Sequence, residues 1–179
     1  MASILSNILN VIIIFSLIPF NLKANDNLKF ERIDDRNGLS SDFVSEIVQD
    51  KEGYLWFATS DGLNRFDGYN VKQYKNRLNG ELYFNSDVFE CIEVASDGKL
   101  WLGTKYYGIH IFDPKTEKVT YISKDTKNGM FINDNQIQDL LCDSKGRIWI
   151  ATYHGVSRYN PDTESIKIFN EDKNNPEIA

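Results

Sequence analysis

A seven-residue phrase built around tryptophan occurs three times in this chain. The copies are GYLWFAT at 53–59, GKLWLGT at 98–104 and GRIWIAT at 146–152. They contain all three tryptophans of the protein, which are 45 and 48 residues apart. A fixed period of this length is typical of chains that stack one structural unit many times, such as solenoids and propellers. Any fold assigned to the chain has to accommodate this repeat.

Each copy lies in a longer unit that we interpret as four short strands. Turns containing Gly, Asp-Gly, Asp-Pro or Asn-Pro separate the strands, and glycine supplies the positive φ that tight hairpins need. Short strands at this spacing are typical of an antiparallel meander. The segment 44–48 alone has helical spacing, but it is short and bracketed by turn residues, so we predict a bulged strand. The expected strands are 44–48, 54–59, 63–66 and 71–74; then 88–94, 100–104, 109–112 and 119–122; then 137–142, 148–152, 156–159 and 166–169.

A four-stranded antiparallel unit repeated head to tail predicts the blades of a β-propeller, an all-β fold. We expect blades at about 43–75, 87–122 and 136–170. The tryptophan of each phrase would fill the gap between neighbouring blades, and the threonine three residues later would bond to backbone. These structural repeat positions are Trp56, Trp101, Trp149, Thr59, Thr104 and Thr152.

Three blades are too few for a ring, because propellers have 4 to 8. We therefore expect an incomplete ring whose partners are the remainder of the propeller or other copies of the chain. Residues 28–33 match the fourth strand of a blade but have no first three strands of their own. They are predicted to be a closing strand that completes the last blade.

The N-terminus predicts export. An apolar run at 8–20 precedes Ala24, which favours a signal peptide at 1–24 cleaved before the partial propeller 25–179. The alternative is an uncleaved anchor, but the run is shorter than the ~20 residues needed to span a bilayer. We expect a periplasmic or extracellular protein.

Composition and motifs exclude several classes of function. The net charge is −6 with no basic run, which argues against a nucleic-acid partner. Cys91 and Cys142 lie in apolar strands, so buried free thiols are favoured over a disulfide. His110 and His154 have no second ligand at metal-binding spacing, and most aspartates lie at turns. We predict no catalytic residues, no metal and no cofactor.

The hairpin between the second and third strands differs among the repeats. The first is the plain turn Ser60-Asp61-Gly62, whereas the other two carry Tyr106 and Tyr107, and Tyr153 and His154. Aromatic faces beside hydrogen-bonding groups suit sugar recognition, so these four residues are the candidate ligand-binding set and an oligosaccharide is the candidate ligand. The alternative is that the tyrosines cover neighbouring blades. Asn64-Arg65 and Ser157-Arg158 are interpreted as structural pairs of the repeat.

The first repeat also carries a family resemblance. The segments 38–44, 50–59 and 62–68 closely resemble the two-component regulator propeller repeat, and the likeness extends over about 28–179. Such repeats are found in the periplasmic sensor regions of hybrid two-component systems, notably in glycan-degrading gut Bacteroidetes. The resemblance implies the N-terminal part of a sensor propeller that binds an extracellular cue, expected to be a saccharide. The kinase would lie outside this chain, which would itself be no enzyme. The alternatives are an exported propeller that acts as an interaction scaffold, and a propeller lyase.

Overall fold

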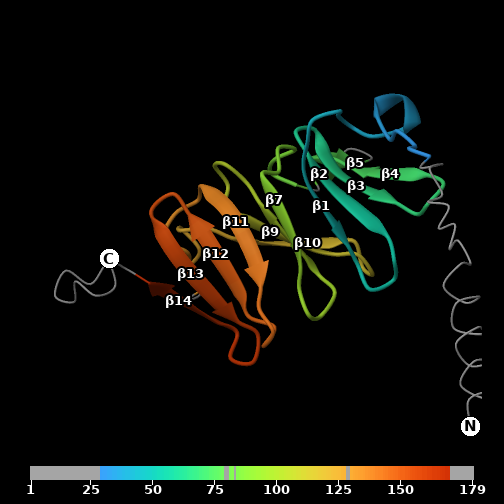
Figure 1. Ribbon diagram of the computed structural model, residues 1–179. Coiled ribbons are helices and arrows are strands. Elements are labelled where there is room, and N and C mark those ends of the chain that lie inside the picture. The colour runs from blue at the N-terminus through green and yellow to red at the C-terminus, as the bar shows by residue number, and fades with distance from the viewer. Residues whose placement is uncertain (1–28, 79–80, 83, 128–129, 170–179) are drawn as a thin grey trace, which may run out of the picture. The chain divides into compact units, whose positions relative to one another are not determined.

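The computed structural model describes residues 29–78, 81–82, 84–127 and 130–169 (Figure 1). The chain divides into two compact units, 1–32 and 33–179, and the described regular elements all lie in the second. The predicted signal peptide lies outside the described residues. Among the residues that are described, no helix is long and apolar enough to cross a membrane.

The first sheet contains β1 (Val44–Gln49), β2 (Leu55–Thr59), β3 (Gly62–Phe66) and β4 (Val71–Tyr74) in that spatial order, all antiparallel. A short 3₁₀ helix, η1 (Asp35–Asn37), precedes it and is capped by Asp34. The register of β1 against β2 shifts between Val44 and Glu46, which confirms the predicted bulge.

The other two sheets repeat this order. The second contains β7 (Cys91–Val94), β8 (Leu100–Gly103), β9 (Ile109–Asp113) and β10 (Lys118–Ile122). The third contains β11 (Ile137–Cys142), β12 (Ile148–Thr152), β13 (Gly155–Asn160) and β14 (Ser165–Phe169). Two short strands, β5 (Arg77–Leu78) and β6 (Glu81–Leu82), form a hairpin between the first and second sheets. The three four-stranded sheets confirm the all-β blade architecture, and within the described residues they close no ring.

The same tight turn joins the first two strands of every blade. The N–H of Asp50 donates to the carbonyl of Tyr54, and the N–H of Gly53 donates back to the carbonyl of Asp50. Ala95 and Asp143 make the equivalent pairs of bonds in the second and third blades. The fourth residue of each turn has positive φ, which glycine adopts without strain; these residues are Gly53, Gly98 and Gly146.

The antiparallel order gives each blade two distinct ends. One carries the hairpin between its second and third strands, together with the connector to the next blade, and we call it the hairpin end. The other carries the turns between the first and second and between the third and fourth strands, and we call it the turn end.

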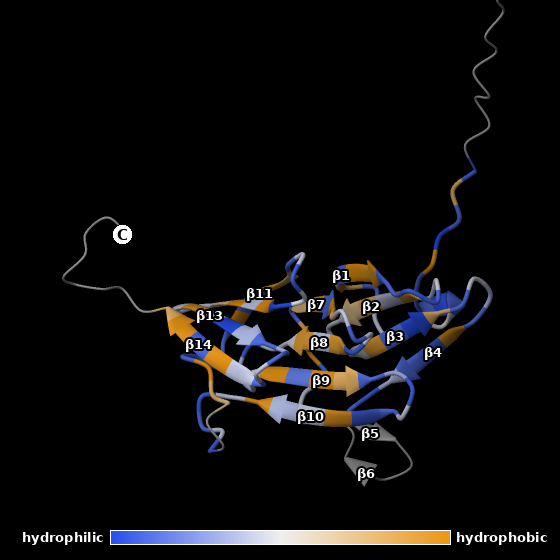
Figure 2. Cartoon of the chain, turned by 90° about the horizontal axis from the view of Figure 1, so that it is seen from below, coloured by the Kyte–Doolittle hydropathy of each residue, from blue (hydrophilic) through white to orange (hydrophobic). Residues whose placement is uncertain are grey.

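The apolar core lies between the blades. Apolar residues recur along the strands of all three sheets (Figure 2). In the first interface Trp56 contacts Tyr74 of its own blade and Phe112 of the next, with ring centroids 5.7 and 5.8 Å apart. In the second interface Trp101 contacts Tyr159 of the next blade at 5.0 Å. These two tryptophans therefore fill the gaps between blades.

Trp149 lies at the equivalent position of the third blade, where its ring stacks on Phe169 of the same blade at 5.4 Å. The threonine of each phrase closes the hairpin next to it. The hydroxyls of Thr59, Thr104 and Thr152 donate to the carbonyls of Gly62, Gly108 and Gly155 at 2.7, 2.8 and 2.8 Å.

Polar contacts repeat at the two interfaces between blades. The N–H of Phe89 donates to the Thr59 carbonyl, and Ile137 does the same to Thr104. Carboxylates also reach across: Glu46 accepts the N–H of Ile92 at 2.7 Å, and Glu93 accepts the N–H of Cys142 at 3.1 Å. The pKa of Glu46 is raised, mainly by its burial.

Two further predictions concern the cysteines and the closing strand. Cys91 is buried and Cys142 half-buried, and both are free thiols. Burial raises the pKa of the Cys91 thiol to about 12, so this thiol stays protonated and packs as a small apolar group.

The predicted closing strand is not formed in this structure, because residues 29–33 lie in no strand. Their pairing with a last blade stays a prediction.

Candidate functional site

The candidate ligand-binding residues all lie at the hairpin end, on two adjacent blades. Tyr106 and Tyr107 belong to the hairpin between β8 and β9, and their side chains are 68% and 50% exposed. Tyr153 and His154 belong to the hairpin between β12 and β13, and Tyr153 is 66% exposed. Tyr106 and Tyr107 are thus open to solvent although a blade follows theirs, whereas Tyr153 lies on the last described blade, so both the ligand-binding interpretation and its alternative stay predictions.

A single connector lies between these two hairpins. Its Asn135 carbonyl accepts the N–H of Gly108 from the first hairpin at 3.0 Å. One residue later, the Gln136 carbonyl accepts the N–H of Tyr153 from the second, also at 3.0 Å. The structure thus places both pairs of candidate residues beside one short segment of backbone, although no ring contact joins the two pairs among the described residues.

The connector makes more polar contacts with the second hairpin than with the first. His154 forms an ion-pair contact through Nδ1 with Asp134 of the connector, and the Asn133 amide donates to the His154 carbonyl at 2.7 Å. The His154 contact holds the pKa of Asp134 below its usual range. The Tyr153 and His154 rings meet edge to face at 5.0 Å. In the first hairpin, the Lys105 ammonium lies 5.6 Å from the Tyr106 ring centre.

The sequence did not predict two residues that also lie at the hairpin end, Asp134 and Phe43. Asp134 lies in the connector, away from the repeated tryptophan phrases. Phe43 is 68% exposed, and its carbonyl accepts the N–H of Ser60 from the hairpin of the first blade. It is the counterpart of Gln136, and aligning the connectors by their distance from the following phrase could have found it.

A polar residue in each third strand anchors the connector that precedes its blade. Asn64 accepts the N–H of Ser40 at 2.9 Å, and the Ser157 hydroxyl donates to Asn133 at 3.0 Å. His110 holds the same position in the second blade and is hydrogen-bonded through Nε2 to Asn85. These contacts support a structural role for Asn64 and Ser157.

His110 is fully buried, and its Nδ1 has no hydrogen-bond partner among the described residues. Its ring packs edge to face against Phe84 and Phe89. Burial lowers the pKa of His110 to about 4, so the side chain is neutral at physiological pH.

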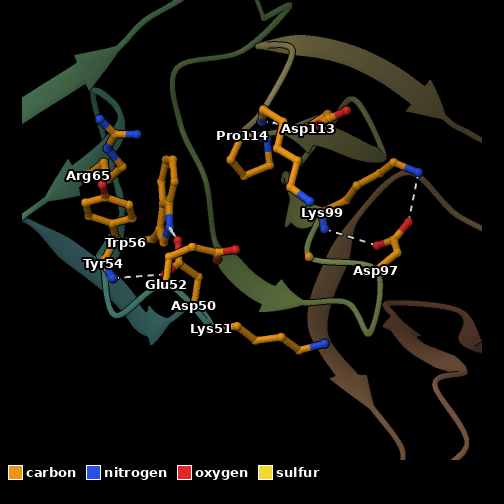
Figure 3. Close-up of a pocket in the computed structure, with 12 residues that line it drawn as sticks. Asp50, Lys51, Glu52, Tyr54, Trp56, Arg65, Asp97, Lys99, Asp113 and Pro114 are labelled. Atoms are coloured by element: carbon orange, nitrogen blue, oxygen red, sulfur yellow. Dashed lines mark hydrogen bonds and ion pairs between the residues drawn. The ribbon is translucent and has the colours of Figure 1, made fainter.

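A pocket of about 570 Å³ lies at the turn end, between the first two blades (Figure 3). Tyr54, Trp56 and Arg65 lie on one side, and Lys99 and Pro114 lie on the other. The guanidinium of Arg65 stacks over the Tyr54 ring at 4.5 Å from its centre. The pocket is therefore at the opposite end of the blades from the candidate ligand-binding residues.

Several charged groups of this pocket form hydrogen bonds or ion pairs with other residues of the protein. Asp50 accepts the indole N–H of Trp56 at 2.7 Å and the N–H of Tyr54 at 2.9 Å. Lys51 donates to the Ser96 carbonyl at 2.6 Å, across the interface. Lys99 pairs with Asp97 at 2.8 Å. Because these contacts join strands, turns and blades, we assign the pocket a structural role.

The repeated four-stranded sheets, with a tryptophan packed between each sheet and the next, define the chain as part of a β-propeller. Solved structures agree with this class. The chain resembles the extracellular domain assigned to a hybrid two-component system of B. thetaiotaomicron, with a TM-score of 0.71 and 22% identity over 80% of this chain and 20% of that one. A second extracellular domain from the same organism, assigned to a one-component system, gives 0.58 and 23% over 78% and 20%. Virginiamycin B lyase from Staphylococcus aureus shares the fold at 0.52 and 14%, over 71% and 41%.

Sequence comparison gives the family. Residues 38–61, 83–106 and 132–154 match the family described as two component regulator propeller. The chain thus carries three two-component regulator propeller repeats. A curated relative, histidine kinase P4 of Formosa agariphila, is 47% identical over 66 residues, which are 36% of this chain and 5% of the relative. The chain spans about a fifth of the two extracellular domains and a small part of this kinase.

Proposed function

We propose that this chain is the N-terminal part of a periplasmic sensor propeller in a hybrid two-component system, and that it takes part in binding an extracellular saccharide. A signal peptide at 1–24 would export it, and a kinase region outside this chain would transmit the signal. The family of the repeats and the extracellular nature of the similar domains support the sensor role.

The observation that carries the ligand proposal is the set of exposed rings at the hairpin end. Tyr106, Tyr107 and Tyr153 expose aromatic faces on two hairpins that share one connector. Beside them, Asp134 and His154 supply charged and polar groups. A sugar ring offers C–H faces to aromatic side chains and hydroxyls to such polar groups, so this combination suits a saccharide better than a purely apolar ligand.

The third blade supports the view that the propeller continues. Its Trp149–Phe169 pair corresponds to the Trp56–Tyr74 pair of the first blade, on which Phe112 of the second blade packs. We infer that a further blade covers Trp149 in the same way. The hairpin end would then be one part of a larger ring surface.

The binding proposal is tested with the full-length protein that contains this chain. We expect one or more members of a panel of plant, algal and host oligosaccharides to raise its melting temperature. The double substitution Tyr106→Ala with Tyr153→Ala should weaken binding of the same oligosaccharide at least tenfold in calorimetric titration. Tyr69→Ala is the matched control, because Tyr69 is 92% exposed but lies at the turn end. Equal losses in both variants, or no loss in the double variant, would contradict the proposal.

A further inference from the structure

The second blade lacks an acceptor that the other two blades provide for their tryptophan. In the first blade Asp50 accepts the indole N–H of Trp56 at 2.7 Å, and in the third Asp143 accepts that of Trp149 at 3.0 Å. The residue at this turn position in the second blade is Ala95, although the backbone bonds of the turn are the same. Trp101 is only 3% exposed; its indole N–H makes no hydrogen bond to the described residues, and the nitrogen itself is open to solvent.

Two neighbouring positions are also smaller or less polar in the second blade. Ile111 lies opposite Trp101, where the first blade has Arg65 opposite Trp56 and the third has Arg158 opposite Trp149. Ile122 replaces the aromatic ring that the fourth strand supplies elsewhere, as Tyr74 and Phe169. The interface between the second and third blades therefore has less side-chain volume around its tryptophan.

A pocket of about 490 Å³ occupies this place. Its apolar lining includes Trp101, Ile111 and Ile122 of the second blade, together with Ile148 and Tyr159 of the third. The Tyr159 hydroxyl has no hydrogen-bond partner among the described residues, and burial raises its pKa. The charged groups of the lining are Asp97, Lys99, Asp113, Lys118 and Glu164.

Two of the three carboxylates in the lining already accept hydrogen bonds from groups other than the indole N–H. Asp97 accepts the N–H and the ammonium of Lys99 at 3.1 and 2.8 Å. Asp113 accepts the N–H of Lys115 and the hydroxyl of Thr116, both at 2.9 Å. Glu164, the third carboxylate of the lining, makes no hydrogen bond to Trp101 either, so the indole N–H is left to solvent or to a group from outside the described residues. The corresponding indoles of Trp56 and Trp149 both bind a carboxylate.

We propose that this pocket binds a small organic acid, whose carboxylate takes the place of the missing aspartate beside Trp101 and whose apolar ring or chain packs on the isoleucines. The lining shares no residue with the candidate saccharide set, so this proposal does not depend on that one. The carboxylate could belong to an aromatic acid or to an acidic sugar, and both would present the same acceptor.

The test uses phenylacetate and glucuronate as probes of the full chain in calorimetric titration, with phenethylamine as a probe of similar shape and opposite charge. We expect saturable binding of phenylacetate or glucuronate, at least tenfold tighter than that of phenethylamine. Binding of phenylacetate alone assigns the site to aromatic acids, and binding of glucuronate alone assigns it to acidic sugars. Failure of both acids to bind would overturn the proposal.

The substitution Ala95→Asp places a carboxylate where the other blades have one. It should bond to Trp101, occupy the site and weaken binding of the acid at least tenfold. Ser144→Asp adds the same charge to an exposed turn residue outside the pocket lining, and it should leave binding unchanged. Trp101→Phe keeps a ring against Tyr159 but removes the donor, and it should also weaken binding. Unchanged binding in either Ala95→Asp or Trp101→Phe would contradict the proposal.

Discussion

At the scale of single residues, the buried aspartate–tryptophan bond is a main support of the repeat. Asp50 is 9% exposed, and its carboxylate bonds both to the indole N–H of Trp56 and to the N–H of Tyr54. Its removal leaves two donors without their acceptor, one of them buried. A lost partner of this kind costs about 1–3 kcal/mol.

Asp50→Ala should therefore lower the free energy of unfolding by about 1–3 kcal/mol, measured by urea denaturation. Asp97→Ala serves as the control, because Asp97 pairs with Lys99 at the surface and such pairs contribute about 0–1 kcal/mol. If the two substitutions cost the same, the indole bond has no special role in stability.

The buried His110 predicts a dependence of stability on pH. Its pKa is about 4 in the folded protein, below the ordinary value of 6.5, because burial disfavours the charged imidazolium. The unfolded chain therefore binds a proton more readily than the folded one between these values. Proton uptake by the unfolded chain therefore lowers the free energy of unfolding as the pH falls from about 6.5 toward 4, by an amount on the order of 3 kcal/mol. Above about pH 6.5 this loss is absent.

His110→Asn should remove this part of the acid dependence. The measurement is the difference in free energy of unfolding between parent and variant at pH 7 and pH 4.5. His154→Asn is the control, because His154 is exposed and its substitution leaves His110 in place. The prediction fails if the pH dependence of His110→Asn matches that of the parent.

At the scale of elements, the close approach of the second and third blades depends on a glycine. Blades one and three have Ala58 and Ala151 as the fourth residue of their second strand, whereas the second blade has Gly103 there. A Cβ on Gly103 would lie 2.4 Å from the Cys91 sulfur and 2.6 Å from a methyl group of Ile137 in the next blade. The blades cannot accommodate that atom without moving.

Gly103→Ala should destabilise the protein by about 1–3 kcal/mol, as overpacking of a core does. The double variant Gly103→Ala with Cys91→Ala should recover part of this loss, because the sulfur is one of the two obstructions. A thermodynamic cycle over the two single variants and the double variant measures the coupling. Simple additivity of the two single effects would show that the Cys91 contact is not the cause.

The strands and the packing of the tryptophans could be predicted from the sequence because they follow from local signals. Glycine and aspartate mark the turns, and the repeated phrase places Trp56, Trp101 and Trp149 at equivalent points. The connector contacts could not be predicted in this way. Asp134 meets His154 across 20 residues, and Asn85 meets His110 across 25, so both pairings depend on how blades stack. The pocket beside Trp101 depends on Ala95, whose significance emerges only when the bonds of Asp50 and Asp143 are known.

At the scale of the whole molecule, the two ends of the blades differ in chemistry. The hairpin end exposes Tyr106, Tyr107 and Tyr153 around a connector. The turn end uses most of its charged groups in bonds within and between blades. A ligand bound across both hairpins, as we propose, would contact two blades and their connector at once. Under that proposal, a change in how neighbouring blades pack is the physical route from binding to a signal.

The most direct test of the sensor proposal is hydrogen–deuterium exchange of the full-length protein with and without an oligosaccharide that it binds. We predict that the ligand slows amide exchange at the hairpins 104–108 and 152–155 and at the connector 133–137. Exchange at the turns 50–53 and 143–146 should stay unchanged. Protection confined to the turn end, or the absence of any protection within this chain, would contradict the account.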